Sequence, residues 1–291
     1  MDTAQLSTVS LDALPPPEMA RKAEQVGVTK AGLDAATTFA LAVLAGAFIA
    51  MGAVFATTTT AGGSDLPYGV ARLIGGLTFS LGLILVVVAG AELFTGNNLI
   101  VMAWASRRVS TLRLLRNWAI VYAGNLVGAL ATAGLMYASK QYEFGNGAVG
   151  LQAVTIAASK TSLGWGQAVV LGALCNALVC IAVWLCYSAR TTADKILAII
   201  PPIAAFVASG FEHSVANMYF IPYGLLVNSN DAYWSQQQDV TLPTSPDLTW
   251  SGFVTANLIP VTIGNIIGGA LMVGAIYWFV YLRPREAAAA A

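Results

Sequence analysis

The lengths of the apolar stretches constrain this chain more than any other feature. They run at about 35–57, 69–106, 114–138, 163–187, 196–228 and 251–281. A helix needs about 20 apolar residues to cross a bilayer. The stretches at 69–106 and 196–228 have 38 and 33 residues, too many for one straight crossing and too few for two with a turn. We therefore expect six transmembrane helices, of which the second and the fifth are broken.

Composition agrees with an all-α protein embedded in a lipid bilayer. Hydrophobic residues make up 57% of the chain, charged residues 10%, and the mean hydropathy is +0.71. A water-facing surface cannot cover so much apolar material. The formal net charge of zero gives no sign of a nucleic-acid partner. The three cysteines lie in one apolar stretch without metal-ligand spacing, so we expect no metal and no cofactor.

Glycines and polar residues mark both breaks, in "VVVAGAELFTGNNLIV" and "FVASGFEHSVANMYF". The two breaks share the frame G-x-E-x-x-x-x-N, with a separation of 120 residues: Gly90, Glu92 and Asn97 recur as Gly210, Glu212 and Asn217. A second echo, "GNLVGALATAG" at 124 and "GNIIGGALMVG" at 264, lies 140 residues apart. Three helices per half make the two repeats inverted. We expect the two glutamates to accept backbone N–H groups freed by the breaks.

The basic residues predict the orientation. Eleven of the fourteen lie on one side of the six segments, which the positive-inside rule assigns to the cytoplasm. We expect both termini on that side of the inner (cytoplasmic) membrane. Residues 1–30 are predicted to form an amphipathic N-terminal segment whose helix begins near Pro17, rather than a cleavable signal. Residues 31–285 would form the channel domain, and 286–291 a C-terminal tail.

His213 is the only histidine, and it lies beside Glu212 in the second break. Ionisable residues inside membranes usually face a cavity or a partner, and imidazole titrates near neutral pH. We interpret His213 as a working group of a transport pathway; a neutral histidine bonded to a loop carbonyl is the alternative. Lys160, just before the fourth stretch, is either a solvated lysine or an attractor of anions at a pore mouth.

These motifs resemble those of the formate/nitrite transporter family. The stretches "VVAGAELFTG" and "GALCNALVCIA" are similar to its two signatures, and "FVASGFEHSVANM" and "NLIPVTIGNIIGG" are similar to its later helices. The resemblance covers essentially the whole chain. It implies an aquaporin-like inverted repeat, one pore in each protomer of a homopentamer, and transport rather than enzymatic activity.

The resemblance also implies roles for individual residues. Thr95 and His213 would meet at mid-pore, Asn176 and Asn265 would complete its polar lining, and Lys160 would stand in the outer vestibule. The apolar constrictions around the histidine would be formed by Phe79, Leu83, Phe94 and Phe206. The implied passenger is formate, which His213 would protonate so that a neutral acid crosses the constrictions.

Alternatives to formate remain open within the family: nitrite, acetate or hydrosulfide. An aquaporin-type channel for neutral solutes would carry paired Asn-Pro-Ala motifs, which this sequence lacks. An intramembrane enzyme would need a motif such as H-E-x-x-H or G-x-S-x-G, and neither is present.

Overall fold

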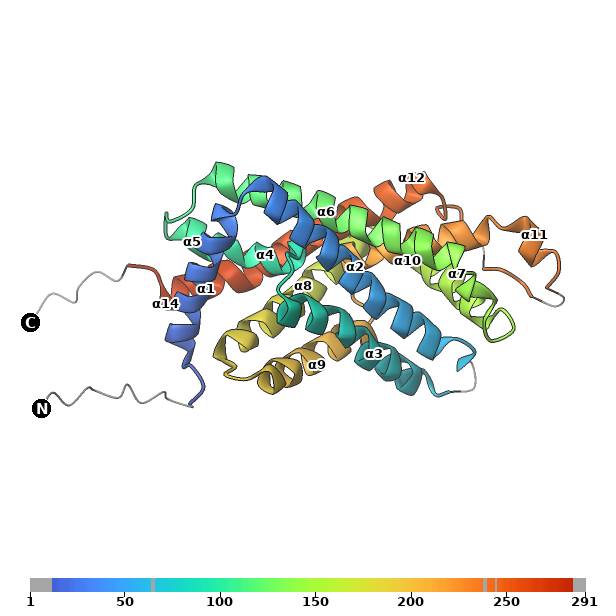
Figure 1. The fold of residues 1–291 in the computed structure, drawn as a ribbon, viewed down its shortest axis with the longest axis horizontal. Helices are drawn as coiled ribbons and strands as arrows, with labels where there is room; N and C mark the ends of the chain where they lie inside the picture. The colour runs from blue at the N-terminus through green and yellow to red at the C-terminus, as the bar shows by residue number, and fades with distance from the viewer. Residues whose placement is uncertain (1–11, 64–65, 238–239, 244, 285–291) are drawn as a thin grey trace, which may run out of the picture.

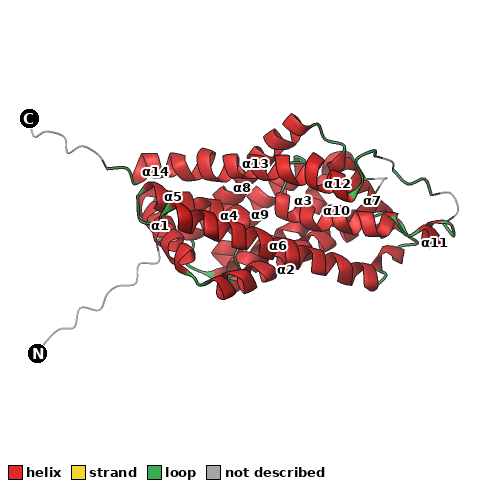
Figure 2. Cartoon of the chain, turned by 90° about the horizontal axis from the view of Figure 1, so that it is seen from above, coloured by secondary structure: helices red, strands yellow, loops and turns green. Residues whose placement is uncertain are grey.

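The computed structural model describes residues 12–63, 66–237, 240–243 and 245–284. Within these ranges the chain is helical, without a strand (Figures 1 and 2). The expected tail at 286–291 and the beginning of the N-terminal segment lie outside the described residues. The first half contains α1 (Pro16–Gly32), α2 (Ala35–Thr60), α3 (Tyr68–Ala89), α4 (Phe94–Asn97), η2 (Asn98–Ile100), α5 (Val101–Ala105), α6 (Thr111–Ala138) and η3 (Gln141–Glu143).

The second half has a similar order of elements. It contains α7 (Ala148–Thr161), α8 (Trp165–Ser188), α9 (Thr192–Ala208), α10 (Ser214–Asn228), α11 (Asp231–Trp234), α12 (Trp250–Gly252), η4 (Phe253–Leu258), α13 (Ile259–Ile266), η5 (Ile267–Ala275) and α14 (Ile276–Tyr281). The elements from α12 to α14 form one continuous helical segment, in which η4 and η5 are π-helical.

Five helical segments of the described chain are long and apolar enough to cross a membrane: α2, α3, α6, α8 and the segment Trp250–Tyr281. The stretch expected at 196–228 is divided between α9 and α10, of 17 and 15 residues. At about 1.5 Å per residue neither reaches the roughly 30 Å of a hydrocarbon core. The stretch expected at 69–106 is likewise interrupted after α3. Both predicted breaks are confirmed.

Each break begins at a glycine in the left-handed region. Gly90 ends α3 with φ 82°, and Gly210 follows α9 with φ 75°. Residues with a Cβ rarely adopt this conformation. In the extended segments that follow, Glu92 N donates to Leu41 O of α2 and Glu212 N donates to Leu171 O of α8, both at 3.2 Å. Neighbouring helices thus satisfy backbone groups that lipid could not.

The two halves run in opposite directions. The end of α8 lies against α1, because Lys22 Nζ donates to Tyr187 O at 2.9 Å. The end of α2 lies against α7, because Gln152 Nε2 donates to Thr60 Oγ1 at 3.1 Å. Since α1 precedes α2 and α7 precedes α8, α2 and α8 are antiparallel (Figure 1). The fold is therefore an inverted repeat in which α1 and α7 occupy corresponding places.

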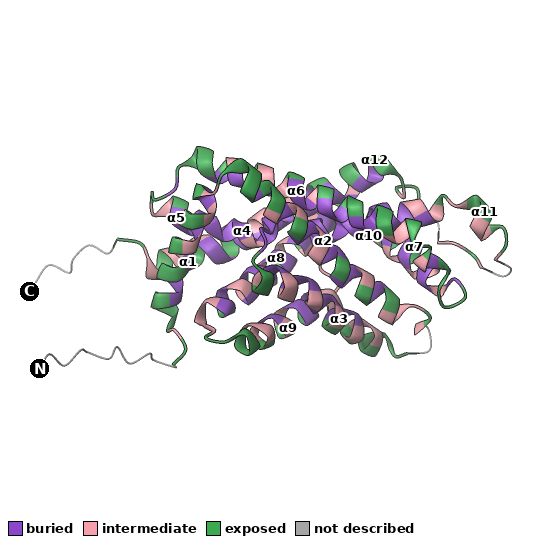
Figure 3. Ribbon diagram, viewed as in Figure 1, coloured by how far each residue is buried: buried purple, intermediate pink, exposed green. Residues whose placement is uncertain are grey.

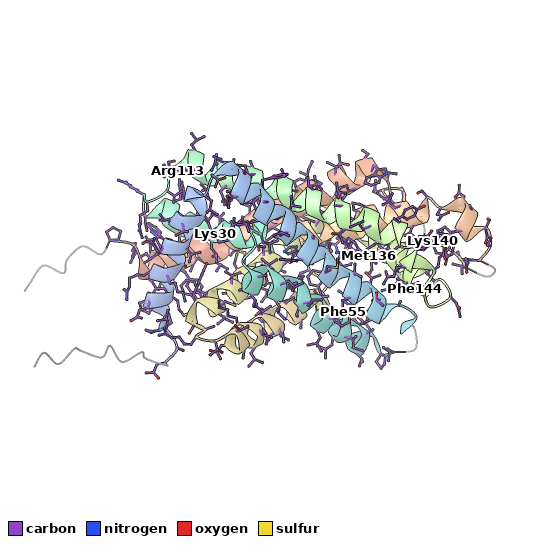
Figure 4. All side chains as sticks on the ribbon, in the orientation of Figure 1. Lys30, Phe55, Arg113, Met136, Lys140 and Phe144 are labelled. Atoms are coloured by element: carbon purple, nitrogen blue, oxygen red, sulfur yellow. The ribbon has the colours of Figure 1, made fainter. Side chains whose placement is uncertain are left out.

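Buried residues lie along the middle of the helix bundle, and exposed ones along its sides and ends (Figure 3). Many exposed side chains are large and apolar, such as Leu112 and Leu135. Lys30 and Arg113 lie at the end that contains α1, and Lys140 and Phe144 lie at the opposite end (Figure 4). Apolar sides between charged ends are what an integral membrane protein requires.

Candidate functional site

His213 lies at the second break, where it is the N-cap of α10. Its Nδ1 accepts a hydrogen bond from Ala216 N at 3.0 Å, and its Nε2 lies 3.0 Å from Thr95 Oγ1 on α4. The two residues expected to meet at mid-pore are thus in contact. Because Nδ1 accepts, the one hydrogen of a neutral ring resides on Nε2. The buried ring therefore offers a single N–H donor.

The inverted repeat does not place a histidine at the first break. Leu93 occupies the corresponding position, 120 residues before His213, with nearly the same backbone conformation: φ −107° and ψ 126°, against φ −114° and ψ 111°. Its apolar side chain makes no cap hydrogen bond. The two breaks thus have nearly the same backbone conformation, and they differ chemically because one carries leucine and the other histidine at this position.

Two asparagines accept hydrogen bonds from the first residues of the helices that follow the breaks. Asn125 Oδ1 accepts from Phe94 N at 2.9 Å, and its amide donates to Ala42 O and Glu92 O. Asn265 has the same role in the second half: its Oδ1 accepts from Ser214 N at 2.9 Å, and its amide donates to Gly172 O and Glu212 O. Both side chains are buried and bonded to backbone. These bonds satisfy groups that each break exposes.

Asn176 joins the two halves behind the breaks. Its Nδ2 donates to Asn265 O at 2.7 Å and to Asn98 Oδ1 at 2.8 Å, with a longer contact to Thr95 O at 3.3 Å. Neither Asn176 nor Asn265 lines the two cavities described below. The structure therefore places these two predicted residues in the scaffold that holds the site.

A cluster of four polar residues supports each break. In the second half, Lys160 Nζ lies 2.8 Å from Glu212 Oε1, Asn217 Nδ2 donates to Glu212 Oε2 at 2.7 Å and to Asn257 Oδ1 at 2.7 Å, and Asn257 Nδ2 donates to Lys160 O at 2.9 Å. The glutamate was expected to accept backbone N–H groups. Its carboxylate instead accepts hydrogen bonds from side chains. Its backbone N–H donates to Leu171 O, and its backbone C=O accepts from the amide of Asn265.

The first half contains the same cluster. Lys30 Nζ lies 2.7 Å from Glu92 Oε1, and Asn97 Nδ2 donates to Glu92 Oε2 at 2.6 Å and to Asn117 Oδ1 at 2.9 Å. Asn117 Nδ2 donates to Lys30 O at 3.2 Å, as Asn257 Nδ2 does to Lys160 O in the second half. From the sequence, Lys30 was used only to predict the topology, and Asn117 and Asn257 were not identified as site residues. The signal was present: Lys160 follows Lys30 by 130 residues, and Asn257 follows Asn117 by 140.

Replacing Glu212 by glutamine should destabilise the protein by about 3 kcal/mol, because it leaves the ammonium of Lys160 in a buried site without its counter-charge. The two side chains are 15% and 5% exposed. Thermal unfolding of the purified protein in detergent measures the loss. Glu143→Gln is the matched control: its pair with Lys140 is 3.8 Å long and exposed, and such pairs contribute about 1 kcal/mol or less. Equal losses in the two variants would contradict the expectation.

One cavity of about 640 Å³ leads to His213 from the end of the bundle that carries α7. Its wall includes Lys160, Glu212 and Asn217, and its depth is lined by Phe79 and Phe206. The two phenylalanine rings pack edge to face at 5.7 Å, and Phe206 stacks on the His213 ring at 5.9 Å. We call this the outer cavity.

A second cavity, of about 350 Å³, opens toward α1, and we call it the inner cavity. It reaches Leu83 and Leu93, and its wall includes Lys30 and Glu92. Leu83 lies one helical turn along α3 from Phe79, a rise of about 6 Å. The two cavities therefore approach each other from opposite ends across one apolar turn of α3.

Of the four expected constriction residues, Phe94 is the one that lies away from both cavities. It packs edge to face against Tyr122 at 4.9 Å and against Trp118 at 6.1 Å. It is buried and lines neither cavity.

Further cations lie at the inner cavity beside Lys30. Lys22 and Lys195 both line it. The pKa of the Lys22 ammonium is lowered, chiefly by partial burial and to a lesser degree by the nearby positive charges of Lys195 and Arg190. Three lysines and one glutamate thus line the inner mouth, an excess of positive charge of the kind that concentrates small anions.

Comparisons with known proteins agree with one another. Residues 17–279 match the model of the formate/nitrite transporter family. The chain is 47% identical to the formate channel FocA of Escherichia coli (strain K12) over 281 residues, which cover 94% of this chain and 97% of that one. It is 43% identical to FocA of Haemophilus influenzae, with 94% and 95% covered. A solved pentameric formate channel with formate bound superimposes with a TM-score of 0.80 at 45% identity, covering 86% of this chain and 98% of the other.

Proposed function

The chain belongs to the formate/nitrite transporter family, and we propose on this basis that it conducts formate across the cytoplasmic membrane. The observation that carries the proposal is the position of His213. Its Nε2, bonded to Thr95, lies at the end of the outer cavity, where the apolar turn of α3 begins. A small carboxylate can receive a hydrogen bond there, at the point beyond which a bare charge is costly.

Transfer of a proton from His213 to formate is the proposed crossing step. A neutral ring holds its only hydrogen on Nε2, so the proton that is passed on must be a second one, carried by an imidazolium. That cation has no lone pair on Nδ1 for Ala216 N–H. The proton that formate receives leaves from Nε2, so the ring keeps its other hydrogen on Nδ1 just after the transfer. The cap of α10 returns only when Nε2 is protonated again and Nδ1 gives up its hydrogen to water. Neutral formic acid then crosses between Phe79, Phe206 and Leu83, and water re-protonates the ring.

The remaining residues have supporting roles in this proposal. Thr95 orients the imidazole through its hydroxyl group. Lys160 and Glu212 keep the wall of the outer cavity polar down to the histidine. Asn176 and Asn265 hold the break in register from behind, and Phe94 supports the wall through its contacts with Tyr122 and Trp118. Glu92, Asn97 and Asn217 maintain the two polar clusters.

Assembly and orientation follow the same reasoning. We propose a homopentamer with one pore in each protomer, by analogy with the solved pentameric formate channel. Both termini would face the cytoplasm, since described basic residues in or beside α1, α5 and α9 lie together: Lys22, Lys30 and Lys195 line the inner cavity, and Arg108 pairs with Glu24 of α1. There α1 would cover the inner mouth, which it lines with Lys22, Gly27 and Lys30.

Flux through proteoliposomes tests the proposal. Purified protein should carry formate in both directions, with uptake that increases as the external pH falls, because each crossing takes up a proton. The same vesicles should be assayed with nitrite, acetate and hydrosulfide, which a pore for small weak acids distinguishes poorly. Formate flux no higher than in empty liposomes would refute the proposal. A preference for another of these anions would correct the substrate and leave the pathway intact.

A further inference from the structure

Arg72 lies on the wall of the outer cavity and takes no part in the clusters described above. It is in the second turn of α3, and its guanidinium is held by the end of α9: Nε donates to Ala208 O at 3.2 Å and Nη2 donates to Val207 O. These carbonyls precede the break at Gly210. The group is therefore fixed in position at the edge of the helix interruption that carries His213.

The charge of Arg72 differs in kind from that of Lys160. Lys160 is neutralised by Glu212 at 2.8 Å. Among the described residues, no carboxylate lies within ion-pair distance of Arg72. Backbone carbonyls carry only partial charge, even at a helix end. Of the cations lining the outer cavity, Arg72 is thus the one whose charge no described carboxylate cancels.

The guanidinium also has capacity to bind. Two of its five N–H groups serve the carbonyls of α9, and three remain. A Cβ built on Gly210 would lie 3.4 Å from Nη2, so the absence of a side chain there leaves this side of the group uncovered. A planar fork of N–H donors matches the geometry of a carboxylate.

We infer that Arg72 is a docking site in the outer cavity for small carboxylates and similar oxyanions, which it passes on to His213. The inference deepens the proposed function and rests on it. Both residues line the same cavity, and Gly210, which lies against the guanidinium, is three positions before His213 in the chain. Arg72 recruits the anion while it is still hydrated, and His213 acts on it where water is excluded.

The test measures formate uptake against external formate concentration at low ionic strength. Arg72→Gln retains a hydrogen-bond donor for α9 but removes the charge, and Arg72→Lys retains the charge. We expect the glutamine variant to need about three to ten times more formate for half-maximal uptake, with a maximal rate close to native. The shift should shrink in about 0.5 M of an inert salt, which screens the charge. The lysine variant should stay closer to the native protein.

Lys140→Gln is the matched control, because it removes one positive charge at the same end of the bundle but outside the cavity. It should behave as native. Half-saturation and salt response of Arg72→Gln equal to those of the native protein would overturn the inference and leave Arg72 a purely structural cap of α9. Equal shifts in Arg72→Gln, Arg72→Lys and Lys140→Gln would overturn it too, because they would indicate an effect that is not specific to Arg72.

A second variant decides the question if Arg72→Gln does not fold. Ser159 is exposed and lines the same cavity. Ser159→Asp adds a compensating carboxylate without touching α9, and should raise the half-saturating concentration in the same salt-dependent way; no shift would count against Arg72. Native protein without formate flux would refute the proposed function itself, whereas native flux with these variants unchanged would refute only the docking site.

Discussion

Replacing His213 by asparagine is expected to lower formate flux by about 100-fold or more and to remove its pH dependence, in protein that remains folded. Asparagine is among the best N-cap residues, so it can still accept from Ala216 N as the Nδ1 of His213 does. It cannot exchange a proton, and a positioned proton donor contributes typically 10²–10⁴-fold. Uptake of formate into liposomes between pH 5 and 8, the ordinary titration range of histidine, measures both effects.

His213→Phe is the companion variant, because it removes the cap together with the titrating group. It should lose flux as the asparagine variant does and in addition lose about 1 kcal/mol of stability, seen as a lower unfolding temperature in detergent. Native flux with a native pH response in folded His213→Asn protein would exclude His213 from the proton transfer. The pair separates the role of the ring in the chemistry from its role in starting α10.

Gly128→Ala is expected to cost about 4 kcal/mol or more, in the range of the most damaging single substitutions. A Cβ on Gly128 of α6 would lie 2.0 Å from Val43 O and 2.9 Å from Ala47 N, both backbone atoms of α2. Backbone cannot move aside as a side chain would, so the two helices would have to separate along their length. The yield of folded protein and its unfolding temperature in detergent report the effect.

Gly134 provides the control on the same helix. A Cβ built there has no heavy atom within 4 Å, and alanine is the better helix former. Gly134→Ala should therefore leave the unfolding temperature unchanged or slightly raised. Similar behaviour of the two variants would mean that α2 and α6 are not in closest contact at Gly128. The two glycines belong to the same sequence echo, so their different surroundings could not be inferred from the pattern.

The crossings and their breaks could be predicted because membrane thickness sets the length of an apolar helix. The stretches at 69–106 and 196–228 had the wrong length, and their glycine and glutamate frames marked where the chain must turn. The inverted order of the halves followed from the odd number of helices in each repeat. Here the signal is local in sequence, since the apolar length and the glycine and glutamate that mark the break all lie within one stretch.

The direction in which a polar side chain points could not be predicted in the same way. Asn265 and Asn176 were expected to line a pore, but their amides bond backbone and side-chain groups behind the break. An asparagine near an interrupted helix can serve either the freed backbone or the lumen, and the residue type fits both. The pairing of Lys30 with Glu92 was missed for a related reason, since a basic residue beside a crossing is already explained by topology.

The hydrogen bonds of Lys30 limit how α1 can move. Its ammonium lies 2.7 Å from Glu92 Oε1 and 3.0 Å from Asn97 Oδ1, and its carbonyl accepts from Asn117 Nδ2. Lifting the whole helix would leave the 6% exposed carboxylate of Glu92 without its cation, a loss of about 3–5 kcal/mol. Bending near the beginning of α1 avoids that loss. An opening of the inner cavity that keeps this pair intact would therefore need a hinge ahead of Lys30. The last turn of α1 would stay anchored, and the first turns would have to give up the hydrogen bond from Lys22 to Tyr187 O.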